Sequence, residues 1–203
     1  MKKLILLAFL AMFIPAIVYG QGKIEAPVWN TGDKWILPED VTIMVVNADE
    51  RSYSVKYLIG SGESILIYEK STLNRLYTMD RNKRIKYEGR NKRLFNFPLE
   101  IGKSWEDKFT VKPGTVGAKE VTYLETFTPL GWEDIEIQAE KFKAVKIEYK
   151  QAMVGQTEGR PKEGKTWYWY SPDVKYMVKC QYEKTDYWDA IYNWELTSFK
   201  LKE

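Results

Sequence analysis

Residues 41–60, VTIMVVNADERSYSVKYLIG, decide the fold of this chain. Apolar residues occupy every second position in two runs, Val41-Ile43-Val45 and Val55-Tyr57-Ile59. This period is typical of β-strands that bury one face, because successive side chains point to opposite sides of a sheet. Asn47–Glu50 between the runs is rich in turn-forming residues. The stretch therefore predicts two antiparallel strands joined by a tight turn.

The same pattern continues along the chain after Pro38. β-branched and aromatic residues, which favour pleated surfaces, alternate in five further runs: Ile65–Ile67, Val121–Tyr123, Val145–Tyr149, Val178–Tyr182 and Tyr192–Leu196. Turn-rich segments separate the runs at intervals of about ten residues. These segments are Gly60–Glu63, Asp80–Lys83, Lys112–Gly117, Pro129–Trp132 and Gly155–Gly164. Beyond the N-terminus, the one candidate for a short helix is Leu94–Lys103.

The predicted fold class is all-β, with residues 21–203 forming one antiparallel domain that is long enough to bury a core. We expect a single strongly curved sheet or an incomplete β-barrel, and the alternative is a closed barrel or a two-sheet sandwich. Gly32-Asp33-Lys34-Trp35 and Gly102-Lys103-Ser104-Trp105 are a weak internal repeat. The repeat indicates either two similar β-halves or simply two tryptophans that each close one end of the core.

The N-terminus has the three regions of a secretory signal peptide. Lys2 and Lys3 precede an apolar run, Leu4–Ile14, and the small-residue ending Val18-Tyr19-Gly20 follows. The run is shorter than the roughly 20 apolar residues that cross a bilayer, which disfavours a retained membrane anchor. We therefore expect residues 1–20 to form a cleaved signal helix, and no integral membrane span to remain after cleavage.

The cysteine content and the net charge limit the possible cellular compartments and binding partners of the protein. No cysteine lies near Gly20, so a bacterial lipoprotein anchor is missing, and Cys180 is the only cysteine of the chain. No Asn-x-Ser/Thr sequence is present. These features predict a bacterial periplasmic or extracellular protein. Loss of Lys2 and Lys3 leaves the chain near neutrality, which gives no reason to expect nucleic acid as a partner.

Four segments resemble uncharacterised exported β-domain proteins of bacteria. They are Trp29-x-x-Gly32-Asp33-Lys34-Trp35, Phe97-Pro98-Leu99-x-x-Gly102-Lys103-Ser104-Trp105, Phe142–Ile147, and Trp169-Tyr170-Ser171-Pro172-x-Val174 followed by Val178-Lys179. Such proteins are similar to the open-barrel carriers that move lipoproteins across the periplasm. The resemblance implies a curved sheet with an apolar concave face. It implies no catalytic residues, because the matching positions are glycines, aromatic residues and a proline.

The composition disfavours most catalytic mechanisms. The chain has no histidine, so Ser-His-Asp and Cys-His nucleophiles are excluded, and one cysteine cannot build a usual zinc site. We therefore predict no catalytic residues, no metal and no cofactor. Cys180 alternates with Val178 and Tyr182, which predicts a buried and unreactive thiol. A glycosidase-like mechanism with paired carboxylates remains open, although we favour a solvated surface for these side chains. The candidate carboxylates are Glu133, Asp134, Glu136, Asp186 and Asp189.

Aromatic residues are the strongest candidates for ligand binding. Trp167-Tyr168-Trp169-Tyr170 places two tryptophans on one face of a strand and two tyrosines on the other. Trp188, Tyr192 and Trp194 follow in the next hairpin. Flat rings with polar edges bind sugars, line apolar pockets or contact lipid headgroups. The competing interpretation for each ring is a place in the core.

A basic hairpin between Arg75 and Arg93 is the second candidate. The favoured interpretation is that its cations protect an exposed sheet edge from association with another edge. The functional alternative is that they contact anionic lipid headgroups or polysaccharide. The residues assigned to anionic-surface contact are Arg81, Lys83, Arg84, Arg90, Lys92 and Arg93.

The function predicted from the sequence is binding, without catalysis, of an apolar or amphipathic ligand such as a lipid or a lipidated partner. One alternative is a carbohydrate-binding protein that uses Trp167, Trp169 and Trp188 to bind a glycan. The other is a structural or assembly protein of the cell envelope that pairs through a sheet edge.

Overall fold

The computed structural model describes residues 22–80, 82–88, 94–111, 120–154, 163–183 and 193–203. Regular structure within these ranges is entirely β. The first half of the chain forms β1 (Lys34–Ile36), β2 (Thr42–Ala48), β3 (Ser52–Ile59), β4 (Gly62–Glu69), β5 (Arg75–Met79) and β6 (Ile85–Glu88). The second half forms β7 (Trp105–Val111), β8 (Val121–Glu136), β9 (Lys141–Val154), β10 (Glu163–Ser171), β11 (Tyr176–Tyr182), β12 (Trp194–Glu195) and β13 (Ser198–Lys200).

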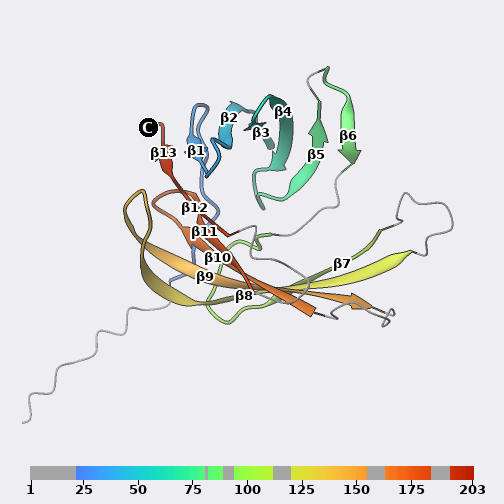
Figure 1. Ribbon diagram of the computed structural model, residues 1–203, viewed down its shortest axis with the longest axis vertical. Coiled ribbons are helices and arrows are strands. Elements are labelled where there is room, and N and C mark those ends of the chain that lie inside the picture. The colour runs from blue at the N-terminus through green and yellow to red at the C-terminus, as the bar shows by residue number, and fades with distance from the viewer. Residues whose placement is uncertain (1–21, 81, 89–93, 112–119, 155–162, 184–192) are drawn as a thin grey trace, which may run out of the picture.

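The strands form two antiparallel sheets that follow the order of the chain. The first sheet has the order β13-β1-β2-β3-β4-β5-β6, and the second has the order β12-β11-β10-β9-β8-β7. Apart from β13, each sheet is therefore a simple meander in which consecutive strands are neighbours. Figure 1 shows the first sheet lying across one face of the second, with β1 near β11 and with β6 and β7 on the far side.

The C-terminal residues join the two sheets. β12 pairs with β11 of the second sheet, and β13, two residues later, pairs with β1 of the first. Between them, Leu196 N donates to Val178 O (2.8 Å) and Thr197 N donates to Ile36 O (2.9 Å). Through this connection the two sheets form one strongly curved surface whose two outer edges are β6 and β7. Among the described residues, each of these two strands pairs on one side only. The predicted all-β, open and strongly curved antiparallel fold is confirmed.

The core lies on the concave side of this curved surface, called the inner face here. Alternate residues of both sheets are buried on it, including Trp35, Val55, Phe127 and Ile147. Tryptophan side chains of the first half also contact the turn before β11. Trp29 Nε1 donates to Lys175 O and Trp35 Nε1 donates to Val174 O, both at 2.9 Å, and the Trp35 ring stacks on Tyr176.

Two predictions on local structure were wrong. Pro129–Trp132 is no turn, because β8 continues through it with a shift of register between Pro129 and Gly131. A bulge of this kind admits a proline without ending the strand. Leu94–Lys103 is not helical: Leu99 forms an isolated β-bridge with Ile24, and Phe95 and Phe97 pack on Tyr170. These tertiary contacts outweigh the weak helical preference of the segment.

The internal repeat marks the same turn in both halves. Gly32 and Gly102 have φ angles of 97° and 80°. Asp33 N donates to Asn30 O, and Lys103 N donates to Glu100 O, so each glycine closes a four-residue turn before β1 or β7. Each glycine N also donates, at 2.8 Å, to the second strand of its own meander. The repeat therefore indicates two similar β-halves, and Trp35 and Trp105 are buried in both of them.

Gly102 offers a direct test of the turn. A side chain at Gly102 meets no atom within 4 Å, so Gly102→Ala tests the left-handed backbone alone. We expect a loss of about 1–2 kcal/mol of unfolding free energy, measured by urea denaturation. Gly164→Ala is the control, since Gly164 also faces open space, has no left-handed φ, and should leave stability unchanged or raised. Equal losses in both variants would contradict this account of the turn.

Candidate functional site

β10 separates the predicted aromatic residues onto opposite faces of the second sheet, as expected from their alternation. Tyr168 pairs with Ile147 and Cys180 on the inner face, whereas Trp169 pairs with Lys146 and Lys179 on the outer face. Tyr170 is also directed into the core and is 1% exposed. Trp167 shares the outer face with Trp169 and is partly buried. The structure therefore divides the predicted cluster into two environments.

Trp169 lies beneath two lysines on the outer face. The Nζ atoms of Lys146 and Lys179, from the strands on either side, lie 5.1 and 5.5 Å from its ring centroid. Its indole N–H donates to Glu133 Oε2 (2.7 Å), and this bond, followed by Lys146, lowers the pKa of Glu133. Lys179 in turn pairs with Glu195 at 2.8 Å. Trp169 is thereby only 5% exposed, even though it lies on the outer face.

The inner face of the second sheet carries a ladder of aromatic rings. Trp105, Phe127 and Tyr149 are neighbours across β7, β8 and β9. The Trp105 and Phe127 rings are stacked with centroids 5.5 Å apart, and the Phe127 and Tyr149 centroids are 4.9 Å apart. Tyr168 continues the row at 6.3 Å from Tyr149. Burial raises the pKa of Tyr168, with further contributions from Cys180, Tyr182 and Tyr149.

A carboxylate is buried beside this ladder. Glu125 of β8 is fully buried and accepts hydrogen bonds from the Tyr149 hydroxyl and from Gln151 Nε2 (3.0 Å). Asp107 lies directly opposite on β7 and is partly exposed. A buried carboxylate is tolerated only when donors surround it. Tyr149 and Gln151 therefore hold Glu125 in a polar row, Asp107, Glu125 and Gln151, which lies next to the aromatic ladder on the inner face.

Beyond the ladder the inner face emerges toward solvent. Phe109 and Tyr123 are stacked partners, 5.1 Å apart, and Met153 is the next neighbour of Tyr123. All three are partly exposed. We call Phe109, Tyr123, Met153 and Tyr182 the inner aromatic end, because they share this face near the ends of β7, β9 and β11 and the start of β8.

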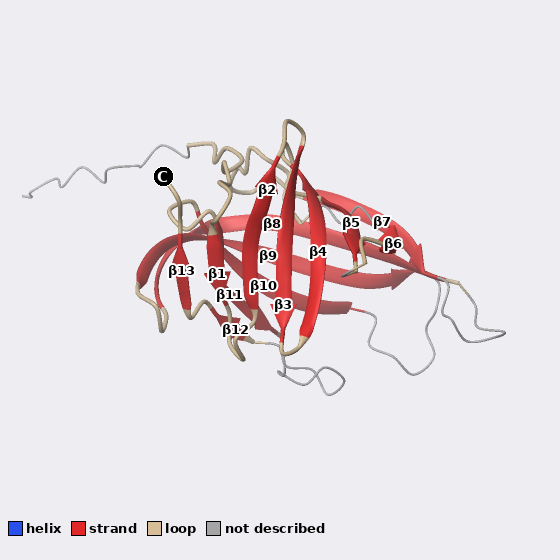
Figure 2. Cartoon of the chain, turned by 90° about the horizontal axis from the view of Figure 1, so that it is seen from above, coloured by secondary structure: helices blue, strands red, loops and turns tan. Residues whose placement is uncertain are grey.

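The direction of the strands explains why this end is uncovered by the first sheet. Figure 2 shows β2, β3 and β4 running across β8, β9 and β10, so the cover along β8 depends on the width of the first sheet and not on the length of its strands. β8 has 16 residues and β9 has 14, and at about 3.4 Å per residue they span roughly 50 Å. The 7 strands of the first sheet, at about 4.8 Å spacing, span roughly 30 Å. Figure 1 shows β7, β8 and β9 projecting past the first sheet. The sequence analysis missed Phe109, because Glu106, Asp107 and Lys108 precede it and mask the alternation.

The remaining predicted aromatic residues lie near the same sheet. Trp188 and Tyr192 fall outside the described residues, in the connection that follows Tyr182. Trp194 pairs with Cys180 and is partly buried. It contributes to a hollow of about 340 Å³ that is also lined by Pro38, Lys179, Cys180, Gln181, Asn193 and Glu195. Cys180 itself is 1% exposed, so its predicted burial is confirmed.

The basic hairpin is described only in part. Lys83 and Arg84 are exposed in the turn between β5 and β6, and Arg84 Nε lies 3.4 Å from Asp80 Oδ2. Asp80 Oδ1 also accepts hydrogen bonds from the backbone N–H of Asn82 and Arg84. Four residues predicted to contact an anionic surface lie outside the described residues: Arg81, Arg90, Lys92 and Arg93.

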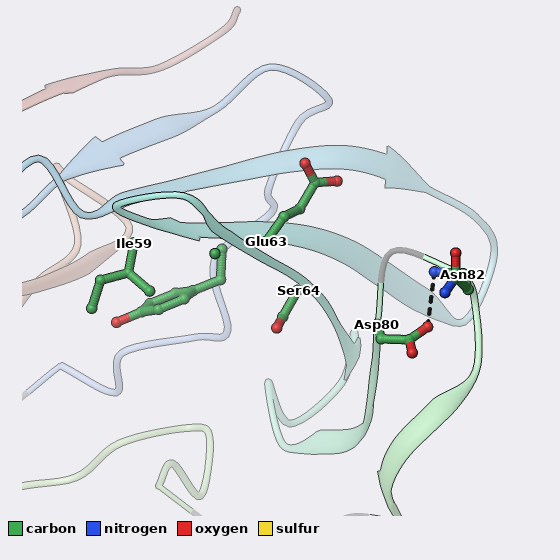
Figure 3. A pocket seen from close by; sticks show the side chains of 7 residues that line it. Ile59, Glu63, Ser64, Asp80 and Asn82 are labelled. Atoms are coloured by element: carbon green, nitrogen blue, oxygen red, sulfur yellow. Dashed lines mark hydrogen bonds between the residues drawn. The ribbon is translucent and has the colours of Figure 1, made fainter.

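A second hollow, of about 360 Å³, lies beside this turn. Its lining residues are Tyr57, Ile59, Gly62, Glu63, Ser64, Asp80 and Asn82. Figure 3 shows Glu63 directed away from Asp80. Glu63 pairs instead with Lys56 at 3.2 Å, and Asp80 is occupied by its own turn. The two acids therefore do not face each other as a carboxylate pair would.

The other candidate carboxylates do not form a described pair either. Glu133 is bound to Trp169 and Lys146, whereas Asp134 and Glu136 are exposed. Asp186 and Asp189 lie outside the described residues. Within the described ranges, no three carboxylate or thiol side chains gather closely enough to hold a metal ion. No helix long and apolar enough to span a bilayer occurs in those ranges.

Comparison with known proteins gives two structural matches. The fold is similar to that of the hypothetical lipoprotein YmcC from Escherichia coli K12, with 14% identity, coverage of 89% of this chain and 90% of that chain, and a TM-score of 0.46. It is also similar to a Bacteroides fragilis protein described as exported and as having a YmcC-like fold, with 12% identity, 88% and 100% coverage, and a TM-score of 0.33. No family model and no curated protein matches the chain.

The Tyr149 hydroxyl can be tested as a support for Glu125. Tyr149→Phe removes a donor from a buried carboxylate, and we expect a loss of about 1.5–3 kcal/mol of unfolding free energy in urea denaturation. Tyr123→Phe is the control, because Tyr123 is partly exposed on the same face. If both variants lose the same stability, the Glu125 bond is not the cause.

Buried tyrosines should make the protein sensitive to alkali. Burial raises the pKa of Tyr68 to about 12 and also raises the pKa of Tyr170 and Tyr176. Tyrosine in an unfolded chain ionises near pH 10, so the folded state holds these protons more tightly. Their contribution is fully present below about pH 10 and is lost as the pH rises through 12.

We therefore expect the Tm to fall as the pH rises above 10, together with a late rise in tyrosinate absorbance. Tyr68→Phe should flatten part of this fall, since it removes one of the titrating groups. Uniform tyrosine ionisation near pH 10 with no change in Tm would contradict the burial argument.

Proposed function

We propose that the chain is an exported bacterial protein that binds, without catalysis, an apolar or amphipathic ligand on the inner face of its curved sheet. The ligand class is a lipid or the acyl chain of a lipidated partner. The inner aromatic end is the observation that carries this proposal. Aromatic and apolar side chains remain partly exposed there, on a face that is otherwise the core of the protein.

The chemistry of this end supports an amphipathic ligand. Phe109 and Met153 offer apolar contact, and the row of Asp107, Glu125 and Gln151 separates them from the buried ladder of Trp105, Phe127 and Tyr149. Tyr123 and Tyr182 add phenol groups, which combine an apolar ring with a polar edge. A ligand with an acyl chain and a polar group fits a surface of this composition.

The geometry gives less support to the rival functions. Trp169 lies beneath Lys146 and Lys179, so its ring is not presented as a flat platform for a sugar. Glu133 is engaged by Trp169 and Lys146, which disfavours its use in glycoside cleavage. The absence of histidine from the sequence removes the commonest general base. Lipid binding therefore remains the function that best fits the described residues.

Phe109 and Thr110 form a matched pair for testing the site. They are consecutive in β7 and point to opposite faces, and Thr110 contacts Thr122 on the outer face at 2.9 Å. Phe109→Asp places a charge on the proposed binding surface, and we expect the affinity for a fluorescent fatty-acid probe to fall at least about tenfold. Thr110→Asp should leave the affinity within about twofold.

Native mass spectrometry of the gently purified protein adds an independent measurement. We expect a mass increment from a co-purified lipid in the wild type and its loss in Phe109→Asp. An apo mass together with no uptake of the fatty-acid probe would refute the proposal. Equal loss of uptake in both Asp variants would place the ligand elsewhere or indicate general destabilisation.

A further inference from the structure

β7 has a bare edge where its counterpart in the first sheet is covered. β1 and β7 both follow the glycine turn of the internal repeat, and each is the first strand of its meander. β1 pairs with β2 on one side and with β13 on the other. β7 pairs with β8 along its whole length, and within the described ranges no strand pairs with its other side. The similarity of the two halves therefore identifies the free edge of β7, at one border of the second sheet in Figure 2, as a place where a strand can be added.

The side chains of β7 define which strand fits this edge. Trp105 and Phe109 lie on the inner face, whereas Glu106 and Lys108 lie exposed on the outer face. No ion pair within the described residues involves Glu106 or Lys108. Directly opposed residues of antiparallel strands share a face. A fitting strand therefore carries apolar residues opposite Trp105 and Phe109 and charges of opposite sign opposite Glu106 and Lys108.

β7 of a second copy meets both requirements. In an antiparallel pair centred on Asp107, Trp105 of each copy lies opposite Phe109 of the other, and Glu106 lies opposite Lys108. Two aromatic pairs then form on the inner face and two opposite-charge pairs form on the outer face. Cross-strand pairs of both kinds stabilise antiparallel sheets.

The charge pattern also selects the register of this pair. A shift by one residue would bring the inner aromatic residues of one copy to the side of the other copy's outer face. A shift by two residues would place either Glu106 or Lys108 opposite its own copy and would break both charge pairs. Charged edge strands deter association where like signs meet. In the selected register the one such contact is Asp107 with Asp107 of the second copy, at the two-fold axis.

We propose that β7 pairs with β7 of a second copy and that the protein forms a two-fold symmetric dimer through this edge. The second sheets of the two copies then become one continuous antiparallel sheet, which is an isologous contact. Both inner aromatic ends lie on the same side of that sheet. The pairing is made by backbone groups at the edge, so it does not depend on the proposed lipid binding.

Sedimentation velocity of the delipidated protein over a dilution series measures the dimer. We expect a Kd of about 10–100 μM for the wild type, because one short edge strand makes a small interface. Glu106→Lys turns both charge pairs into like-charge pairs and should weaken the dimer at least about tenfold. The matched control is Glu136→Lys. It makes the same change of charge at an exposed position where β8 has passed beyond β7, and it should leave the Kd within about twofold.

Two further variants test the register. Glu106→Lys/Lys108→Glu exchanges the two charges within each copy and restores opposite signs across the edge, so its Kd should return to within about threefold of the wild type. Asp107→Asn removes the like-charge contact at the axis and should tighten the dimer by about twofold or more. Circular dichroism and Tm establish that each variant is folded.

Four results would overturn the proposal. A wild type that stays monomeric at about 500 μM has no such dimer. Equal Kd values for Glu106→Lys and the wild type would place the contact on another surface. Failure of the double variant to regain the dimer, or a weaker dimer in Asp107→Asn, would contradict the pairing of β7 about Asp107.

Discussion

The fold depends on one crossing of the chain, at Leu196 and Thr197. Two consecutive backbone N–H groups donate to different sheets, one to Val178 of β11 and the next to Ile36 of β1. Without these bonds each half would be an open meander with an unpaired first or last strand. Asp33 reinforces the junction, since its carboxylate accepts the N–H groups of Asn30 (2.8 Å) and Lys202 (2.7 Å) and lies 3.8 Å from Lys175 Nζ.

Curvature at this junction gives every strand an inner and an outer face. On the inner side, Trp29 and Trp35 from the first half fasten the turn that begins β11, through bonds to Lys175 O and Val174 O. The inner aromatic end lies toward the other end of the second sheet, since Tyr182 ends β11 and Phe109 and Met153 lie near the ends of β7 and β9.

The sequence predicted local structure well where one period dominated. Alternation identified β2, β3, β4, β9 and β11, predicted the burial of Cys180 and separated Trp169 from Tyr168, because β-strand side chains alternate strictly. The alternation left open which of the two rings faces inward, and the structure places Tyr168 on the inner face. The sequence predicted a turn where β8 has a bulge at Pro129–Gly131, because proline and glycine are common in turns and in bulges alike. The contact of Lys146 and Lys179 with Trp169 could not be predicted, because it joins three strands whose register depends on pairings distant in sequence.

The different extents of the two sheets link the fold to the proposed site. Because the strands of the first sheet cross those of the second, the width of the first sheet limits its cover. β8 has 16 residues and continues past this cover, so the inner face at its far end stays partly exposed. A purely structural extension would carry polar side chains on both faces there, as its outer face does at Thr110 and Thr122. Phe109 and Tyr123 instead lie on the inner face there, and the proposed lipid binding depends on them.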